Sequence, residues 1–114
     1  MSGDKAASHS PAVKRYVESI ENQLGPIWYG LVQRYEYRLY IGTVTMTFEI
    51  PAEGGKPQNI RVKSYTFSGW DIVIARSAIE LLRAPPIPKA VLAEIKGDTL
   101  QFEESFTIYP ERGN

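Results

Sequence analysis

The chain has 114 residues, of which 43% are hydrophobic, so it has room for one small domain with a single core and hardly for two. Thirteen basic and thirteen acidic side chains cancel, which removes the overall field that would favour binding to nucleic acid or to a charged membrane surface. The lack of cysteine excludes disulfide bonds, a thiol nucleophile and a thiolate metal site.

The first segment, residues 1–10, is small, polar and without periodicity, and we expect it to be a disordered arm or a remnant of expression. It lacks the apolar core of a secretory signal, and no later stretch approaches the roughly 20 apolar residues that cross a bilayer. The only histidine, His9, lies in this arm. Metal binding and acid–base chemistry require a side chain fixed in position beside a partner group, so we expect neither role for it.

An amphipathic helix is predicted to begin at Pro11, because apolar residues follow at spacings of three and four. Ser10 is suited to cap its N-terminus, and Pro11 fits the first helical position, where its missing N–H costs nothing. Pro26 could end the helix, but the apolar stripe continues beyond it, so we predict a kinked helix to about Arg34. The stripe comprises Val13, Val17, Ile20, Leu24, Trp28, Leu31 and Val32.

Aromatic residues gather in the second half of this helix and in the connection that follows. Such a group can form a ligand cage, but amphipathic rings more often pack over the edge of a sheet, and we interpret them in this second way. The residues are Trp28, Tyr29, Tyr35, Tyr37 and Tyr40.

Residues 41–65 predict a β-hairpin with one buried face and one wet face. After a glycine-rich turn at 54–57, Ile60 and Val62 alternate with Arg61 and Lys63. Before the turn, apolar and polar residues alternate in the same way, with Val44, Met46, Phe48 and Ile50 set against Thr43, Thr45, Thr47 and Glu49.

A second helix is predicted to follow the hairpin. Ser68 and Asp71 have the spacing of a capping box at its start, and Arg83 suits the negative end of the helix. Prolines at 85–88 forbid continuation, and Pro88 can open a short helical turn that runs to Glu94. The apolar face would comprise Ile72, Val73, Ala75, Ala78, Ile79 and Leu82.

The last predicted element is a strand from Thr99 to Tyr109, which Pro110 ends. Its alternation slips at 103–105, Glu-Glu-Ser, which suggests a bulge or an edge position. Residues 111–114 form a short tail.

Together these elements predict one domain, residues 11–110, with the topology α-β-β-α-β. The second and third strands are joined through a helix, so they should run parallel, and a right-handed crossover lets the first strand lie between them, antiparallel to both. The fold class is therefore α+β: a two-layer sandwich with a three-stranded sheet of order 2-1-3 and both helices on one face.

The sequence offers no catalytic or metal-binding constellation, and we expect neither enzymatic activity nor a cofactor. No Ser-His-Asp set or acid cluster has suitable spacing. The turn Gly54-Gly55-Lys56 joins two strands, so it is interpreted as a hairpin turn rather than a phosphate loop. Glu103 and Glu104 with Glu49 could supply paired carboxylates, but acids on strands are more often a solvated face or a charged guard on an edge.

The feature that remains is the free edge of the last strand. A strand with unpaired N–H and C=O groups can add an extended segment of another protein, and this mode needs no particular side chain. Binding by strand addition is thus the function that the architecture offers most directly.

Several segments in order resemble the C-terminal domain of the TonB and TolA energy transducers. The most specific part is the strand Gly42-Thr-Val-Thr-Met-Thr-Phe-Glu-Ile50, the glycine turn and the strand Asn59-Ile-Arg-Val-Lys-Ser64. Supporting parts are Trp28-Tyr29 on the first helix, the small and apolar Ala75, Ala78 and Ile79 on the second, Pro85-Pro-Ile-Pro88, and Phe106-Thr-Ile-Tyr109. The likeness spans about Pro11 to Pro110.

The resemblance implies a periplasmic domain that is tethered through a linker to an inner-membrane helix and driven by the proton gradient. TonB domains add the N-terminal segment of outer-membrane transporters beside their final strand, whereas TolA domains contact envelope proteins of the Tol-Pal system. Both roles stay open, and we expect the chain to be a domain excised from a longer protein. The final strand here, which would meet the partner, comprises Leu100, Gln101, Phe102, Glu103, Glu104, Ser105, Phe106, Thr107, Ile108 and Tyr109.

Other classes of function are left as alternatives. The same edge could pair with a second copy and give a homodimer with a structural role in assembly. A small enzyme could use a pocket beside Tyr35 and Tyr37. Recognition of nucleic acid by the sheet, through Arg61 and Lys63, lacks the characteristic aromatic motif and is not expected.

Overall fold

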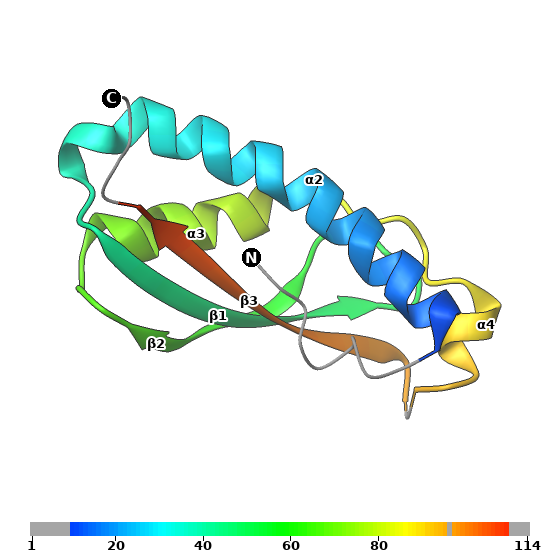
Figure 1. Cartoon of the computed structure of the whole chain (residues 1–114). Helices are drawn as coiled ribbons and strands as arrows, with labels where there is room; N and C mark the ends of the chain where they lie inside the picture. The colour runs from blue at the N-terminus through cyan, green and yellow to red at the C-terminus, as the bar shows by residue number, and fades with distance from the viewer. Residues whose placement is uncertain (1–9, 96, 110–114) are drawn as a thin grey trace.

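The computed structural model describes residues 10–95 and 97–109, so the expected N-terminal arm with His9 and the tail at 111–114 lie outside the described residues. Figure 1 shows two helices on one side of a twisted sheet. The elements in chain order are α2 (Pro11–Tyr35), a 3-10 turn (Glu36–Arg38), β1 (Gly42–Pro51), β2 (Gln58–Tyr65), α3 (Trp70–Leu81), the short α4 (Lys89–Leu92) and β3 (Thr99–Ile108).

In the described part of the chain, the sheet has three strands in the order β2-β1-β3. The central strand β1 is antiparallel to both neighbours, so β2 and β3 run parallel to each other. The predicted α+β sandwich, its α-β-β-α-β topology and its strand order are therefore confirmed. The hairpin keeps consecutive strands adjacent, and the crossover through α3 returns the chain to the far side of β1.

Helix α2 forms where the three- and four-residue apolar spacing predicts it. The Ser10 hydroxyl accepts a hydrogen bond from the Val13 N–H, and Pro11 occupies the first turn. The helix continues through Pro26 to Tyr35, because its buried face continues on both sides of the proline. That face comprises Val13, Tyr16, Val17, Ile20, Leu24 and Val32.

Helix α3 begins differently from the prediction, and the proposed capping box between Ser68 and Asp71 is wrong. The helix starts at Trp70 with Gly69 at the N-cap, and no side chain caps it. Gly69 has a φ of 128°, a region that glycine enters without a Cβ penalty. The Asp71 carboxylate instead accepts a hydrogen bond from the N–H of Tyr40, which precedes β1.

The buried face of α3 is also rotated relative to the predicted one. Ile74 is buried and belongs to a small cluster with Val32 and Ile108, whereas Val73 is half exposed. Arg83 does lie at the helix end as expected, where its guanidinium donates to the carbonyl oxygens of Glu80 and Leu82. The residues buried within the helix are Asp71, Ile74, Ala75, Ala78 and Ile79.

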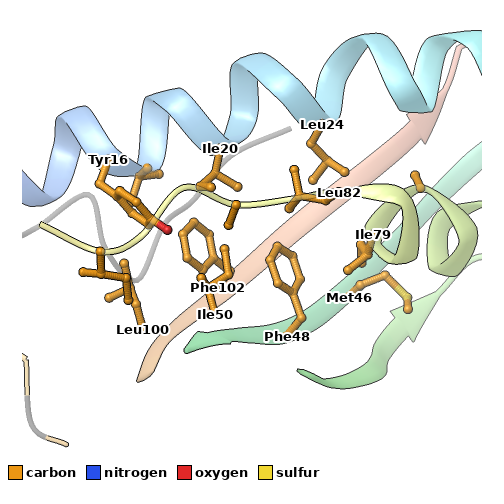
Figure 2. Packing of buried hydrophobic residues seen from close by; sticks show 14 of the residues in the cluster. Tyr16, Ile20, Leu24, Met46, Phe48, Ile50, Ile79, Leu82, Leu100 and Phe102 are labelled. Carbon is orange, nitrogen blue, oxygen red and sulfur yellow. The ribbon is translucent and has the colours of Figure 1, made fainter. Parts of the chain in front are cut away.

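The main core lies between α2 and the sheet (Figure 2). Phe48 of β1 and Phe102 of β3 are cross-strand partners whose rings stack with centroids 5.1 Å apart. Ile20 and Leu24 of α2 lie above these rings, as Figure 2 shows. Aromatic stacking of this kind adds roughly 0.5–1.5 kcal/mol to the burial of the rings.

The hairpin turn is fastened to the proline-rich loop that follows α3. The N–H groups of Gly55 and Ala84 each donate to the other residue's carbonyl oxygen, at 2.7 and 2.9 Å. The Tyr16 hydroxyl donates a hydrogen bond to the Pro85 carbonyl oxygen at 2.7 Å. Burial raises the pKa of Tyr16 to about 12, which favours the protonated phenol that donates this bond. This loop therefore joins α2 to the hairpin.

Gly54 is predicted to be the position in this junction that tolerates a side chain least. Its φ is 76°, and an added Cβ would lie 2.5 Å from the Ala84 carbonyl oxygen and 2.6 Å from backbone atoms of Pro85. We expect Gly54→Ala to lower the free energy of unfolding by more than about 2 kcal/mol, measured by urea denaturation.

Gly55→Ala is the matched control, because Gly55 also has a positive φ but nothing lies within 4 Å of its added Cβ. It should cost only about 1 kcal/mol, the penalty of the backbone conformation. Equal losses in the two variants would contradict the close packing of the turn on the loop.

Candidate functional site

The outer edge of β3 is the candidate site, and it is regular along its whole length. In the described structure β3 pairs only with β1, in one continuous register from Pro51 opposite Thr99 to Gly42 opposite Ile108. The edge position is as expected, but the bulge suggested at residues 103–105 is absent. The alternation continues because Glu104, directly opposite Met46, takes a core-facing position and is fully buried.

Hydrogen bonds at the ends of the sheet establish which backbone groups of β3 point outward. The N–H of Ala52 donates to the carbonyl of Asp98, which continues the β1–β3 register by one pair, and the N–H of Thr66 donates to the carbonyl of Thr43 on the β2 side of β1. Because the groups of successive residues point to opposite sides, even-numbered residues of β3 bond to β1. The outward residues are Thr99, Gln101, Glu103, Ser105 and Thr107.

The edge of β2 is different from that of β3. Its pairing with β1 shifts register twice, between Thr45 and Met46 and between Thr47 and Glu49, and each shift places an extra residue in β2. Asn59, in the second irregular region, has a φ of 52°. Bulges disturb the row of backbone groups and so protect a sheet edge from further pairing. Of the two edges, β3 therefore offers the better template.

Side chains of the outward residues lie on the open face of the sheet, opposite the helices, and cross-strand hydrogen bonds hold them there. The hydroxyls of Thr43 and Thr107 are 3.0 Å apart, and those of Thr45 and Ser105 are 2.9 Å apart. A third contact crosses the whole sheet, because Lys63 of β2 forms an ion pair of 2.7 Å with Glu103.

The opposite side of β3 is covered by α2. The residues of β3 that face the helix, Leu100, Phe102, Glu104, Phe106 and Ile108, are all at most 5% exposed, although the strand is at an edge. Trp28 of α2 lies over Phe106, with ring centroids 4.9 Å apart. An added strand would thus meet the flank of α2 on one side and the open face on the other.

The structure divides the predicted partner-binding residues into two sets. Gln101, Glu103, Ser105 and Thr107 direct backbone groups outward, and Tyr109 follows the strand and is exposed. The even-numbered residues from Leu100 to Ile108 use their backbone groups on β1 and their side chains in the core. Thr99 belongs to the outward set but lies outside the predicted range; the register of the sheet, which sequence alone does not provide, is what identifies it.

The three acidic residues that were candidates for paired carboxylates have different surroundings. Glu103 contacts Lys63 on the open face, and Glu49 accepts hydrogen bonds from the amides of Asn59 and Gln101 at 2.7 and 3.2 Å. Glu104 lies on the other face of the sheet. Glu49 and Glu103 therefore share the open face, each with its own polar contacts, and the sheet separates Glu104 from both.

The aromatic residues do not converge on one point either. Trp28 packs on the core, whereas Tyr29 and Tyr37 are exposed. The others lie at the end of the molecule where α2 and α3 meet: Tyr35 stacks on Trp70 at 5.5 Å, Tyr40 contacts Phe67 at 5.4 Å, and Arg38 lies 5.1 Å from the centre of the Trp70 ring. These contacts are packing at the rim of the core, the interpretation that the sequence favoured.

Within residues 10–95 and 97–109, no group of three His, Cys, Asp or Glu residues is placed to hold a metal ion. The helices in the same range also lack the combination of length and apolarity needed to cross a membrane.

Comparison with known proteins leaves the site without an assigned relative. No family model, curated protein or solved structure matches the chain.

Asp71 is the buried acid that joins the entry of β1 to the start of α3. It is 3% exposed, and its carboxylate accepts the Tyr40 N–H at 3.0 Å. Burial raises the pKa of Asp71 above its ordinary value of 3.8, and the hydrogen bonds from the backbone of Tyr40 and of Asp71 itself offset part of this rise.

This shift predicts the pH dependence of stability. Because the pKa of Asp71 is higher in the folded than in the unfolded chain, the folded state binds more protons between the two values, so Asp71 lowers stability as the pH rises through that window. Asp71→Asn keeps an acceptor for Tyr40 but cannot ionise. We expect the unfolding free energy of the variant, relative to wild type, to increase as the pH rises above about 3.8 and then to become constant.

Denaturation of both proteins from pH 3 to 7 would measure this difference, in which the titration of all other groups cancels. Asp71→Ala serves as the control. It cannot ionise either, so it should show the same pH dependence relative to wild type, but it removes the acceptor and should be roughly 1–3 kcal/mol less stable than Asp71→Asn at every pH. A difference between wild type and Asp71→Asn that does not vary with pH would contradict the raised pKa.

Proposed function

We propose that this chain is a binding module that adds an extended segment of a partner protein to the outer edge of β3. The observation that carries the proposal is the continuous, unbulged edge of a ten-residue strand, in contrast to the twice-bulged edge of β2. β-augmentation uses such an edge as a template, and main-chain hydrogen bonds supply the affinity.

The outward residues of β3 make the edge chemically competent for this role. Thr99, Gln101, Glu103, Ser105 and Thr107 each present one N–H donor and one C=O acceptor, and none of them is proline. Each main-chain hydrogen bond contributes roughly 0.5–1.5 kcal/mol net, and the ordering of a flexible segment offsets part of the sum. A short segment paired along most of the edge would therefore bind with moderate affinity and exchange readily.

The identity of the partner in this proposal comes from the resemblance of several sequence segments to TonB and TolA domains. In this role the chain is a periplasmic domain of an inner-membrane-anchored energy transducer, and the added segment is the N-terminal peptide of an outer-membrane transporter. The TolA-like variant of the proposal replaces the transporter with another envelope protein. The strand order 2-1-3 is compatible with both, because it leaves β3 at the edge.

A second copy of the chain is the alternative occupant of the same edge. An antiparallel pairing with two-fold symmetry about Glu103 would place the two Glu103 carboxylates opposite each other, which is unfavourable, whereas a pairing centred on Ser105 would avoid this contact. Sedimentation over a concentration range separates the two proposals: a monomer that still binds peptides favours the module, and a stable dimer favours self-assembly.

Ser105→Pro should weaken strand addition without breaking the sheet. The N–H of Ser105 points away from β1, so Ser105→Pro removes an outward donor and places a ring against the incoming strand, while the β1–β3 ladder keeps its hydrogen bonds. We expect transporter N-terminal peptides to shift the amide resonances of the outward β3 residues in wild type, and we expect at least a tenfold weaker affinity in Ser105→Pro.

Ser105→Ala is the matched control, because it loses the same contact with the Thr45 hydroxyl but keeps the backbone N–H. It should bind as wild type does, and circular dichroism would establish that both variants fold. Shifts confined to the helices, or equal binding by the proline variant, would count against addition at β3.

A further inference from the structure

We infer that Glu103 selects partner segments that carry a cationic side chain at a central position and fixes the register in which they add to β3. This inference rests on the proposed function and specifies the chemistry of its partner. Among the five outward residues of β3, Glu103 is the only charged one, and it is also the central one: its neighbours are Thr99, Gln101, Ser105 and Thr107.

The geometry of strand addition places a partner side chain directly beside the Glu103 carboxylate. A residue that exchanges main-chain hydrogen bonds with Glu103 lies opposite it in the ladder, about 5.5 Å away between Cα atoms, and its side chain projects from the same face of the sheet. That face is the open one, where the Glu103 side chain is 17% exposed. A lysine or arginine at the opposite position therefore reaches the carboxylate without crossing the core.

Glu103 is held in place for this contact by Lys63. The ammonium group of Lys63 reaches across β1 from the far edge of the sheet and contacts Oε1 of Glu103 at 2.7 Å. A carboxylate accepts hydrogen bonds on two oxygens and from several directions. An incoming strand approaches from the opposite side to Lys63, so its cation and Lys63 would flank the same carboxylate.

Register is the second property that Glu103 controls. A slip of the partner by two residues keeps every side chain on its own face, so it is opposed only by the particular side chains that meet. Gln101, Ser105 and Thr107 are neutral and accept many neighbours, and only Glu103 distinguishes a cation from an anion. The same charge disfavours the self-pairing register in which two Glu103 residues face each other.

The probes for the test are three capped nine-residue peptides in which threonine and valine alternate, with Lys, Gln or Glu at the central threonine position. The valine amides, which would point away from β3, are N-methylated so that the peptides cannot stack into sheets of more than two strands, and sedimentation of the peptides alone checks that they remain monomeric at the concentrations used. Titration of the whole chain, followed by the amide resonances of the outward β3 residues, gives the affinities.

We expect wild type to bind the Lys peptide about three- to tenfold more tightly than the Glu peptide, with the Gln peptide between them. Glu103→Lys should reverse this order. Glu103→Gln removes the charge at this position without placing a second cation beside Lys63, and it should remove most of the preference for one peptide over another. Glu53→Lys is the control for net charge, because Glu53 is exposed in the hairpin turn, away from the edge; it should keep the wild-type order.

Each outcome is decisive for one of the two levels of the proposal. An unchanged order in the Glu103 variants, or the same reversal in Glu53→Lys, would overturn the role of Glu103 while leaving strand addition intact. If none of the three peptides shifts the outward amides of β3 in wild type, strand addition itself fails, and the inference fails with it.

Discussion

The ladder between β1 and β3 is the constraint on which both the core and the candidate site depend. Its ten consecutive pairs assign every residue of β3 to one of two faces, and the stacked rings of Phe48 and Phe102 are one of those pairs. A slip of one residue would move Glu103 into the core and Phe102 into water, so burial of the aromatic residues fixes the register. The same register decides which backbone groups are left for a partner, and the edge is therefore as well defined as the core.

The two edges of the sheet differ because their strands are held in different ways. β3 is covered by α2 along its length, as Trp28 over Phe106 illustrates, and it pairs regularly with β1. The turn before β2 is hydrogen-bonded to the proline-rich loop through Gly55 and Ala84. The pairing of β2 with β1 contains two bulges, each with one extra residue in β2. The bulged strand is less suited to pairing, so the sheet presents one open edge and one guarded edge.

Much of the fold follows from local patterns, whereas the departures come from tertiary contacts. The spacing of apolar residues after Ser10-Pro11 and the alternation in the hairpin predict α2, β1 and β2, and the crossover rule then yields the strand order. The capping box failed because Asp71 accepts a hydrogen bond from Tyr40, which is 31 positions away in sequence. Of the two explanations offered for the slip at 103–105, a bulge or an edge position, the edge holds and the bulge is absent, because Glu104 is buried, which a rule that places charges in water does not foresee. The strand that forms the site could be predicted, but its outward residues could not, since they depend on register.

A site made of backbone groups separates affinity from selectivity. Main-chain hydrogen bonds are available to almost any extended segment, so the edge by itself would discriminate little and would be open to unwanted pairing. Discrimination must come from the side chains beside the edge, and those of the outward residues of β3 are neutral except for Glu103. One fixed carboxylate, oriented by Lys63, can favour a suitable cation and oppose a second copy at once. Its contribution is modest in energy, but where backbone contacts are common to all partners a modest difference decides which one binds.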